Sequence, residues 1–234
     1  MRAIILAGGK GTRLRPYTTL IPKPLVPLGG ETSVIEIIIK QLAQHGFKRV
    51  TVAVNHLSNL IKSYLGDGKK YKIKIDYSVE EKELGTIGPL TLIKDLPDNF
   101  LVMNGDILTD LNYKNFFTNH LKKKNLITLA SCKRQTLVDF GTLVKDKEKL
   151  LNFIEKPKIS YDVSMGIFCL NKKVLKKEKK NKFLNFDKFI INKIKYGVST
   201  FQHHGLWLDI GRVDDYDLAN ENFKCLEKKI LKKV

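Results

Sequence analysis

The 234-residue chain contains few cysteines and no long apolar run. The three cysteines lie far apart and form no Cys-x-x-Cys pair, so we expect neither a disulfide framework nor a zinc site; they are Cys132, Cys169 and Cys225. No apolar run approaches the roughly 20 residues of a membrane-spanning helix, and none of signal-peptide length follows Met1. We therefore expect a cytoplasmic protein without a membrane partner.

Arginine is also scarce, although the chain is strongly basic. Only six of the 42 basic residues are Arg, and the formal net charge is +18. Proteins that read bases rely on Arg for bidentate contacts, and single-stranded nucleic acid binds aromatic side chains that alternate with basic ones. Neither pattern is present, and the lysines collect in runs such as 122–124 and 172–182, typical of a solvated surface. We expect no nucleic-acid partner.

Apolar residues, in contrast, make up 43% of the chain, enough for a sizeable core. In the first half, short apolar runs that predict buried strands alternate with segments of helical spacing. The runs are 3–6, 50–54, 73–77 and 100–103, and the helical segments are 33–45, 57–65 and 89–93. This alternation predicts an α/β fold: a Rossmann-like, doubly wound, mostly parallel mixed sheet flanked by helices. Such a sheet binds ligands at the carboxyl ends of its strands.

The second half is less regular. Strand-like runs follow one another without full helices between them, which predicts antiparallel pairing and a smaller inserted region. The runs are 126–130, 141–144, 151–154, 163–170 and 198–201, and helices are predicted at 186–194 and 213–226. Without repeats or a linker, the chain is predicted to form one compact domain whose halves face each other across a cleft.

A glycine-rich turn follows the first predicted strand, in the run from Leu6 to Pro27. Its glycines let backbone amides approach a phosphate closely. The spacing fits neither a P-loop, which needs Gly-Lys-Ser/Thr, nor the dinucleotide fingerprint, which needs a third glycine. Arg13 lies on the turn, and Lys23 lies ten positions on between two prolines. Two fixed cations beside such a turn predict a clamp for a polyphosphate.

The run from Leu6 to Pro27 resembles the signature of the sugar-1-phosphate nucleotidyltransferases, also called nucleoside-diphosphate-sugar pyrophosphorylases. Further motifs follow in the order of that family and extend the resemblance over about residues 1–220; they lie at 84–89, 103–106, 139–141, 153–157, 164–166 and 207–211. The chain is most similar to short single-domain members of the mannose-1-phosphate guanylyltransferase type, so we expect no left-handed β-helix domain.

This resemblance implies a GT-A-like fold in one nucleotidyltransferase domain over residues 1–234. About 1–110 would bind the nucleotide, about 111–220 would bind the sugar phosphate, and 221–234 would end a C-terminal helix. The implied reaction joins a nucleoside triphosphate to a sugar 1-phosphate and releases pyrophosphate, by Mg²⁺-assisted in-line attack on the α-phosphate. A homodimer is a further expectation from the family.

The resemblance also implies a role for each motif residue. Catalysis is assigned to Arg13, Lys23, Asp106 and Lys156, and Mg²⁺ binding to Asp106 and Asp209. Nucleotide contacts are expected from Leu6, Ala7, Gly8, Gly9, Gly11, Thr12, Arg13, Lys23, Glu80, Gly85, Thr86 and Gly88. Sugar-phosphate contacts are expected from Asn104, Gly105, Gly141, Glu155, Lys156, Ser164 and Gly166.

The base depends on Glu80, which stands where several members of the family have Gln; a shift of one position would place Glu81 there. A carboxylate can accept from the two adjacent donors on the Watson–Crick edge of guanine, whereas the acceptors of uracil and thymine repel it. This favours GTP, and the resemblance to mannose-1-phosphate guanylyltransferase-like members implies a mannose- or heptose-type sugar. Uridylyl-, thymidylyl- and cytidylyltransferases that use another sugar 1-phosphate, or a non-sugar phosphate, stay open as alternatives.

A non-catalytic module on the same fold is a rival interpretation, but it predicts the loss of at least one charged motif residue, and all are present. His203 and His204 are adjacent, so on an extended segment they point to opposite faces and do not readily share a metal ion. We interpret both as structural and Trp207 as core packing.

Overall fold

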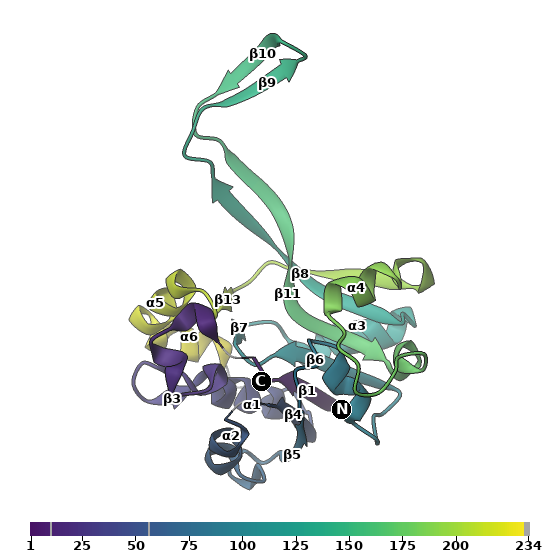
Figure 1. The fold of residues 1–234 in the computed structure, drawn as a ribbon. Helices are drawn as coiled ribbons and strands as arrows, with labels where there is room; N and C mark the ends of the chain where they lie inside the picture. Colours follow the sequence, from purple (N-terminus) through teal and green to yellow (C-terminus); the bar gives the residue numbers. More distant parts are fainter. Residues whose placement is uncertain (10, 56, 232–234) are drawn as a thin grey trace.

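The computed structural model describes residues 1–9, 11–55 and 57–231. Its centre is a seven-stranded sheet in the order β12-β8-β11-β6-β1-β4-β5 (Figure 1). β11 is antiparallel to both neighbours and the other pairs are parallel, which confirms the predicted mostly parallel mixed sheet. The strands are β1 (Arg2–Leu6), β4 (Arg49–Val54), β5 (Lys74–Val79), β6 (Asn99–Asn104), β8 (Ile127–Leu137), β11 (Lys158–Asn171) and β12 (Val198–His203).

Alternate residues of β1 face two hydrophobic clusters, one on each side of the sheet. Ala3 and Ile5 belong to the cluster that α1 helps to cover, and Ile4 belongs to the cluster that contains Phe189 of α4. The helices are α1 (Val34–Gln44), α2 (Ser58–Leu65), α3 (Tyr113–Lys123), α4 (Phe186–Ile191), α5 (Val213–Glu221) and α6 (Phe223–Ile230). In the described part of the chain, no helix has both the length and the apolar character needed to cross a membrane.

Three helical predictions differ from the structure. The segment 89–93 forms only a short 3₁₀ helix, Gly88–Leu92, because the backbone turns to an extended conformation at Ile93. The single helix predicted over 213–226 is broken at Asn222 into α5 and α6, and residues 232–234 lie outside the described residues. Helix α3 was not predicted, although Asn112 caps it by accepting from the Asn115 amide at 2.9 Å.

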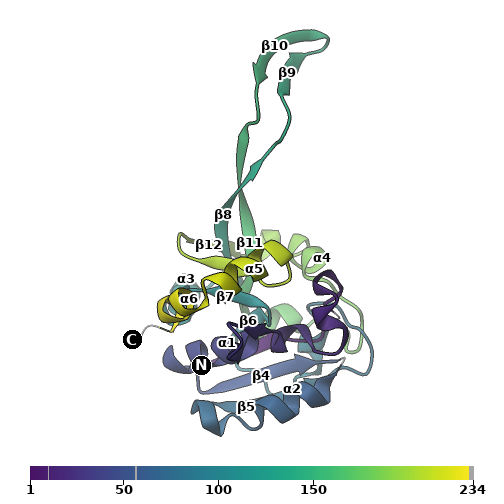
Figure 2. The ribbon, with the colours of Figure 1, turned by 90° about the vertical axis from the view of Figure 1, so that its left-hand side faces the viewer.

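Three two-stranded sheets complete the fold: β2 (Pro27–Leu28) with β3 (Thr32–Ser33), β7 (Ile107–Thr109) with β13 (Trp207–Asp209), and β9 (Thr142–Asp146) with β10 (Lys149–Ile154). The last pair confirms the strands predicted at 141–144 and 151–154. The sequence predicts that this pair belongs to one compact domain, but in the structure it lies outside the body. Beyond the main sheet, β8 and β11 continue as a two-stranded ribbon, and β9 and β10 form its tip, far from the body (Figures 1 and 2). Residues 135–161 are called the arm below.

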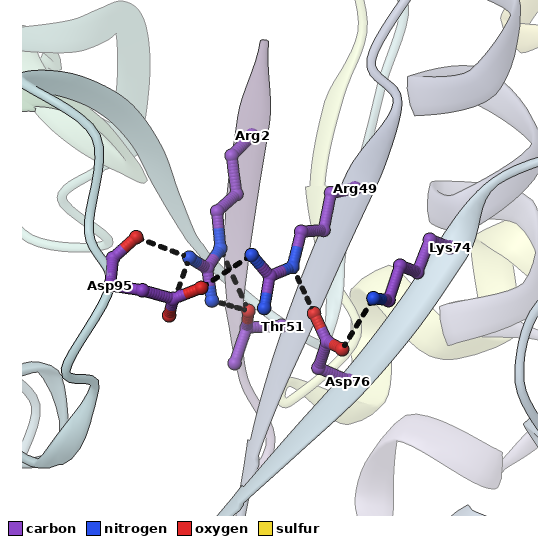
Figure 3. A network of polar contacts seen from close by, with 6 residues as sticks. All are labelled: Arg2, Arg49, Thr51, Lys74, Asp76 and Asp95. Atoms are coloured by element: carbon purple, nitrogen blue, oxygen red, sulfur yellow. Dashed lines mark hydrogen bonds and ion pairs between the residues drawn. The ribbon is translucent and has the colours of Figure 1, made fainter.

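A polar network lies where β1, β4 and β5 begin, the end of the sheet opposite to the predicted site (Figure 3). Arg2, the first residue of β1, donates to Thr51 and to Asp95, the latter at 3.0 Å. Arg49, the first residue of β4, pairs with Asp76 and also with Asp95. Hydrogen bonds from Arg2 and then from Arg49 lower the pKa of Asp95 to about 2.

Replacing Asp95 by Asn is therefore expected to lower the midpoint of chemical denaturation at pH 7. A carboxyl whose pKa is lowered by folding stabilises the fold above its unfolded pKa, and this contribution is lost as the pH falls toward the folded value. The difference between wild type and variant should hence shrink between about pH 4 and pH 2. Asp217→Asn, on the exposed face of α5, is the control and should show no such dependence; equal pH profiles for both variants would contradict the role of Asp95.

Candidate active site

A cavity of about 640 Å³ opens at the carboxyl ends of the central strands. It is lined by eleven of the twelve residues predicted to contact the nucleotide: Leu6, Ala7, Gly8, Gly9, Gly11, Thr12, Arg13, Lys23, Glu80, Gly85 and Thr86. Asn104 and Gly105, predicted to contact the sugar phosphate, and Asp106, predicted to act in catalysis and to bind Mg²⁺, line it too. The structure thus brings the sequence motifs together at the carboxyl ends of the strands, where a doubly wound sheet is expected to bind its ligand.

Backbone pairing sets the position of the glycine-rich turn. Leu6 lies beside Asn104 in the parallel register of β1 and β6, and the Gly105 amide donates to the Leu6 carbonyl at 2.9 Å. Gly11 has a φ of 64°, a conformation that glycine adopts without strain. A β-carbon there would lie 3.0–3.1 Å from Thr18 and Lys23, so this glycine also lets the turn close onto Lys23.

Glu80 lies at the inner wall of the cavity, directly after β5. Its side chain is buried, and one carboxyl oxygen accepts from the Leu84 amide at 3.1 Å. The other oxygen faces Gly8, where a β-carbon would come within 2.8 Å of it. Burial raises the pKa of this carboxyl, with a smaller lowering by the Leu84 hydrogen bond. A carboxylate that faces the cavity with one oxygen is an acceptor for a buried polar ligand.

Two carboxylates and one ammonium group meet at the floor of the cavity. Asp106 follows β6, and pairing of β7 with β13 brings Asp209 beside it, with the Ile210 amide donating to the Asp106 carbonyl at 2.9 Å. Lys23 Nζ contacts Asp106 Oδ2 and lies 4.0 Å from Asp209 Oδ1. Asp106 Oδ1 is buried without a hydrogen-bond partner among the described residues. An unpaired buried carboxylate oxygen is costly, so a ligand cation is expected to complete it.

A second cavity, of about 260 Å³, adjoins the first and shares Thr86 and Asn104 with it. Asp209 and the predicted sugar-phosphate residues Ser164 and Gly166 line it. Gly166 has a φ of 71°, and a β-carbon there would meet the Asn104 amide nitrogen at 2.7 Å. The two cavities are therefore neighbours in one cleft, with Asp106 lining the first and Asp209 lining the second.

A profile of the nucleotidyl transferase family matches residues 2–224. The chain belongs to this family. Its membership among the sugar-1-phosphate nucleotidyltransferases, which the motif resemblance predicted, is thereby confirmed.

The relatives of this chain are named for different nucleotides. The chain is 32% identical over 241 residues to UTP–glucose-1-phosphate uridylyltransferase of Synechocystis sp. (92% of this chain, 61% of the relative). It is 33% identical over 227 residues to probable mannose-1-phosphate guanylyltransferase 1 of Oryza sativa subsp. japonica (92% and 63%). The chain thus spans a little under two thirds of the length of these curated relatives.

The structure of HddC from Yersinia pseudotuberculosis superimposes on this chain with a TM-score of 0.75 at 26% identity, covering 95% of this chain and 99% of HddC. HddC has also been solved complexed with GMP-PN.

Four predicted contacts lie outside the cleft. Gly88 is buried one layer behind it, where a β-carbon would meet the Lys182 carbonyl at 2.8 Å, so its role is packing. Gly141, Glu155 and Lys156 lie on the arm, and Lys156 is paired with Asp139 there at 2.7 Å. The expectation that these three line the same cleft is not met in this structure, because the β8–β11 ribbon, which is regularly paired from Lys158 to Ser164, carries them away from the body.

Several cleft residues were missed in the sequence. Asn55 directly follows β4, so it could have been predicted from the expectation that ligands bind at the carboxyl ends of the strands. Asn185 also lines the cavity, although it comes from the other half of the chain. The neighbouring Leu184 amide donates to the Leu84 carbonyl at 2.9 Å and so holds this segment at the cleft. No local sequence pattern predicts this contact. Trp207 packs against the main hydrophobic cluster, as predicted, and it also lines the second cavity and donates to the Met165 carbonyl at 2.9 Å.

Proposed function

We propose that the chain joins a nucleoside triphosphate, most favourably GTP, to a sugar 1-phosphate of mannose or heptose type. The products are a nucleoside-diphosphate sugar and pyrophosphate. One observation carries this proposal: Arg13, Lys23 and Asp106 line one cavity, and Asp209, 4.0 Å from Lys23, lines the cavity that adjoins it. Fixed cations beside paired carboxylates fit a triphosphate together with its counter-ion.

In the proposed reaction no protein side chain forms a covalent bond with the substrates. An oxygen of the sugar phosphate attacks the α-phosphorus, the bond from this phosphorus to the bridging oxygen of the β-phosphate breaks, and pyrophosphate leaves with the bonding electrons. The nucleophile is already an anion, so no general base is needed. Arg13 and Lys23 neutralise the triphosphate, and the backbone of the glycine-rich turn approaches its oxygens closely.

Asp106 and Asp209 are the residues that would hold Mg²⁺. The unpaired buried oxygen of Asp106 supports this, since Mg²⁺ prefers carboxylate oxygens and shares its other positions with phosphates and water. Within the described part of the chain, no group of three or more His, Cys, Asp or Glu side chains comes together. The site therefore fits an ion bound jointly with substrate. When bound, Mg²⁺ acts as a Lewis acid on the phosphate oxygens.

The preference for GTP rests on Glu80, whose carboxyl oxygen faces the cavity beside Gly8. Guanine presents two adjacent N–H donors that one carboxylate can accept together, whereas uracil and thymine place acceptors beside their single donor. The HddC complex with GMP-PN supports a guanine base. The Synechocystis uridylyltransferase makes UTP the second candidate.

The test measures pyrophosphate release with Mg²⁺ for GTP, UTP, dTTP and CTP, each against a panel of sugar 1-phosphates. We expect the largest kcat/KM with GTP and with mannose or heptose 1-phosphate. A larger value with UTP would retain the reaction and overturn the guanine preference. Folded protein that releases no pyrophosphate with any pair would overturn the proposed function.

Glu80→Gln is expected to narrow the preference for GTP over UTP by about ten- to a hundredfold, since a mispaired buried polar group costs about 1–3 kcal/mol. The wild-type preference should also weaken in acid, beginning at a higher pH than an ordinary Glu would give, because burial raises the pKa of Glu80. Competition assays between the two nucleotides across pH measure both effects. Glu81→Gln, at the exposed neighbouring position, is the matched control; if it changed the preference instead, the pocket assignment would be off by one residue.

Gly8→Ala is expected to raise the KM for the nucleotide, because its β-carbon would come within 2.8 Å of the Glu80 carboxyl and displace it. The same substitution in a Glu80→Ala background is the control, because the carboxyl that the β-carbon would meet is then absent. We expect Gly8→Ala to lower kcat/KM by about tenfold or more in the wild type and by much less in the Glu80→Ala background. An equal loss in both backgrounds would show that Gly8 and Glu80 do not form the base pocket together.

A further inference from the structure

The arm exposes an unusual amount of apolar surface. Ten of the 24 exposed large hydrophobic residues of the described chain lie within its 27 residues, among them Phe140 at 75% exposure and Leu151 at 57%. The side-chain hydrogen bonds and the ion pair of residues 135–161 stay inside that range, and the β8–β11 pairing continues from it into the body at Tyr161 and Arg134. A two-stranded hairpin alone is marginally stable in water, and an apolar patch of this kind marks an interaction surface.

The middle of the arm carries motif residues that the cleft lacks. Two non-strand segments, 138–141 and 155–157, lie side by side there, joined by the hydrogen bond from the Val138 amide to the Pro157 carbonyl at 3.0 Å. They hold Gly141, Glu155 and Lys156, and this part is called the elbow. A β-carbon at Gly141 would lie 3.0 Å from the Glu155 carboxyl, so three of the seven predicted sugar-phosphate residues are assembled at the elbow, outside the cleft.

The elbow does not reach the cleft of its own chain. Lys158 pairs with Leu137 and Ser164 pairs with Ser131 in one continuous ribbon. At about 3.3 Å per residue, Lys158 lies roughly 20 Å from Ser164, which is at the edge of the cleft. β8 contains neither Gly nor Pro, and its first half is held by β12 up to Cys132. Bending it back would break an intact strand.

We propose that two copies of this chain exchange arms, so that the elbow of each completes the sugar-phosphate side of the other's cleft. This inference rests on the proposed function, because it gives Glu155 and Lys156 their substrate. We expect the partner to be a second copy of this chain, because each chain has both a cleft that lacks these residues and an arm that carries them. The exchange is reciprocal, as a two-fold interface requires.

The body offers an apolar face to receive the partner's tip. Tyr17, Leu20 and Ile21 lie between Arg13 and Lys23 in the chain, beside the cleft, and are 40–79% exposed. Helix α5 continues this face, because the rings of Tyr17 and Tyr216 lie 5.6 Å apart. Apolar side chains of β9 and β10 would be covered there instead of facing water.

Cross-linking tests the exchange without using activity. A chain with Lys156→Cys and Ser164→Cys, in a Cys225→Ser background that removes the exposed native thiol, is oxidised and run on a non-reducing gel. We expect a covalent dimer, since each elbow lies at the partner's cleft. Monomers that are cross-linked internally, or that stay uncross-linked, would overturn the proposal.

Sedimentation velocity tests the contact surfaces. Leu151→Asp on the arm and Leu20→Asp on the body are each expected to shift the dimer to monomer. Leu60→Asp is the matched control, because Leu60 is 45% exposed on α2, away from both surfaces. A wild type that is monomeric, or two interface variants that remain dimeric, would contradict arm exchange.

A heterodimer separates the arm proposal from the proposed function. Chains carrying Lys156→Ala and Asp106→Asn are co-expressed with different tags and purified over both. We expect about half of the wild-type rate, since one site then combines an intact body with an intact arm from the other chain. No activity above that of the single variants, with an active wild type, would overturn the exchange. An inactive wild type that still forms the covalent dimer would overturn the proposed function alone.

Discussion

Asp106→Asn is expected to lower the rate of pyrophosphate release by about a thousandfold or more. The substitution keeps the shape of the side chain but removes the charge that pairs with Lys23 and that would hold the proposed Mg²⁺. Negative charge shifts toward pyrophosphate as the bond to it breaks, so the interactions that depend on the Asp106 carboxylate are strongest in the transition state. Removing this carboxylate should therefore lower mainly kcat. The Mg²⁺ concentration that gives half-maximal rate should rise at the same time.

Steady-state kinetics over a Mg²⁺ titration measure both effects of Asp106→Asn. Circular dichroism and thermal denaturation check that the variant is folded. Asp67→Asn is the control, as Asp67 lies in the loop after α2 and outside the cleft. Near-normal turnover at ordinary Mg²⁺ would remove Asp106 from the reaction.

Arg13→Ala is the second substitution with a large expected effect. Arg13 lies on the 3₁₀ helix 12–14 behind the glycine-rich turn, exposed and on the cavity wall. Its guanidinium can neutralise the triphosphate with two parallel hydrogen bonds, and such contacts strengthen as charge builds on the leaving pyrophosphate. We expect a loss of about a hundred- to a thousandfold in kcat.

Two further variants sharpen the test of Arg13. Arg13→Lys keeps the charge but not the planar fork, so it should recover only part of the rate. Arg15→Ala removes a guanidinium two positions on, at an exposed residue that does not line the cavity, and should leave kcat within about twofold of wild type. If Arg13→Ala and Arg15→Ala lost activity equally, general surface charge rather than a positioned cation would explain the effect.

Much of the cleft was predictable because its residues follow strands directly. Leu6, Asn104 and Glu80 stand at or just beyond the ends of β1, β6 and β5, which parallel pairing places at one edge of the sheet. Alternating apolar runs predicted those strands, and strand ends in a doubly wound sheet define where a ligand lies. The pairing of Asp106 with Asp209, more than a hundred positions apart, came only from the family motif; the structure explains it by β7 and β13.

The position of the arm was not predictable in this way. The runs at 141–144 and 151–154 look like any half-buried strand, and a period of two in the sequence does not say whether the apolar side faces a core or a partner. What decides it is that β8 passes from the sheet into the ribbon without a break, so that the same strand is buried at Ile127 and exposed at Leu137. This depends on long-range pairing with β11 and β12.

The sequence by itself determined the sheet, the phosphate-binding turn and the set of charged residues that face it, because local patterns and strand ends encode these. Only the tertiary structure decided which of these residues share a cleft. It placed Gly88 in the packing behind the cavity, brought Asn185 to its rim through a backbone hydrogen bond, and carried Lys156 out on the arm. Such contacts are made between segments distant in the chain, and no local preference of either segment specifies them.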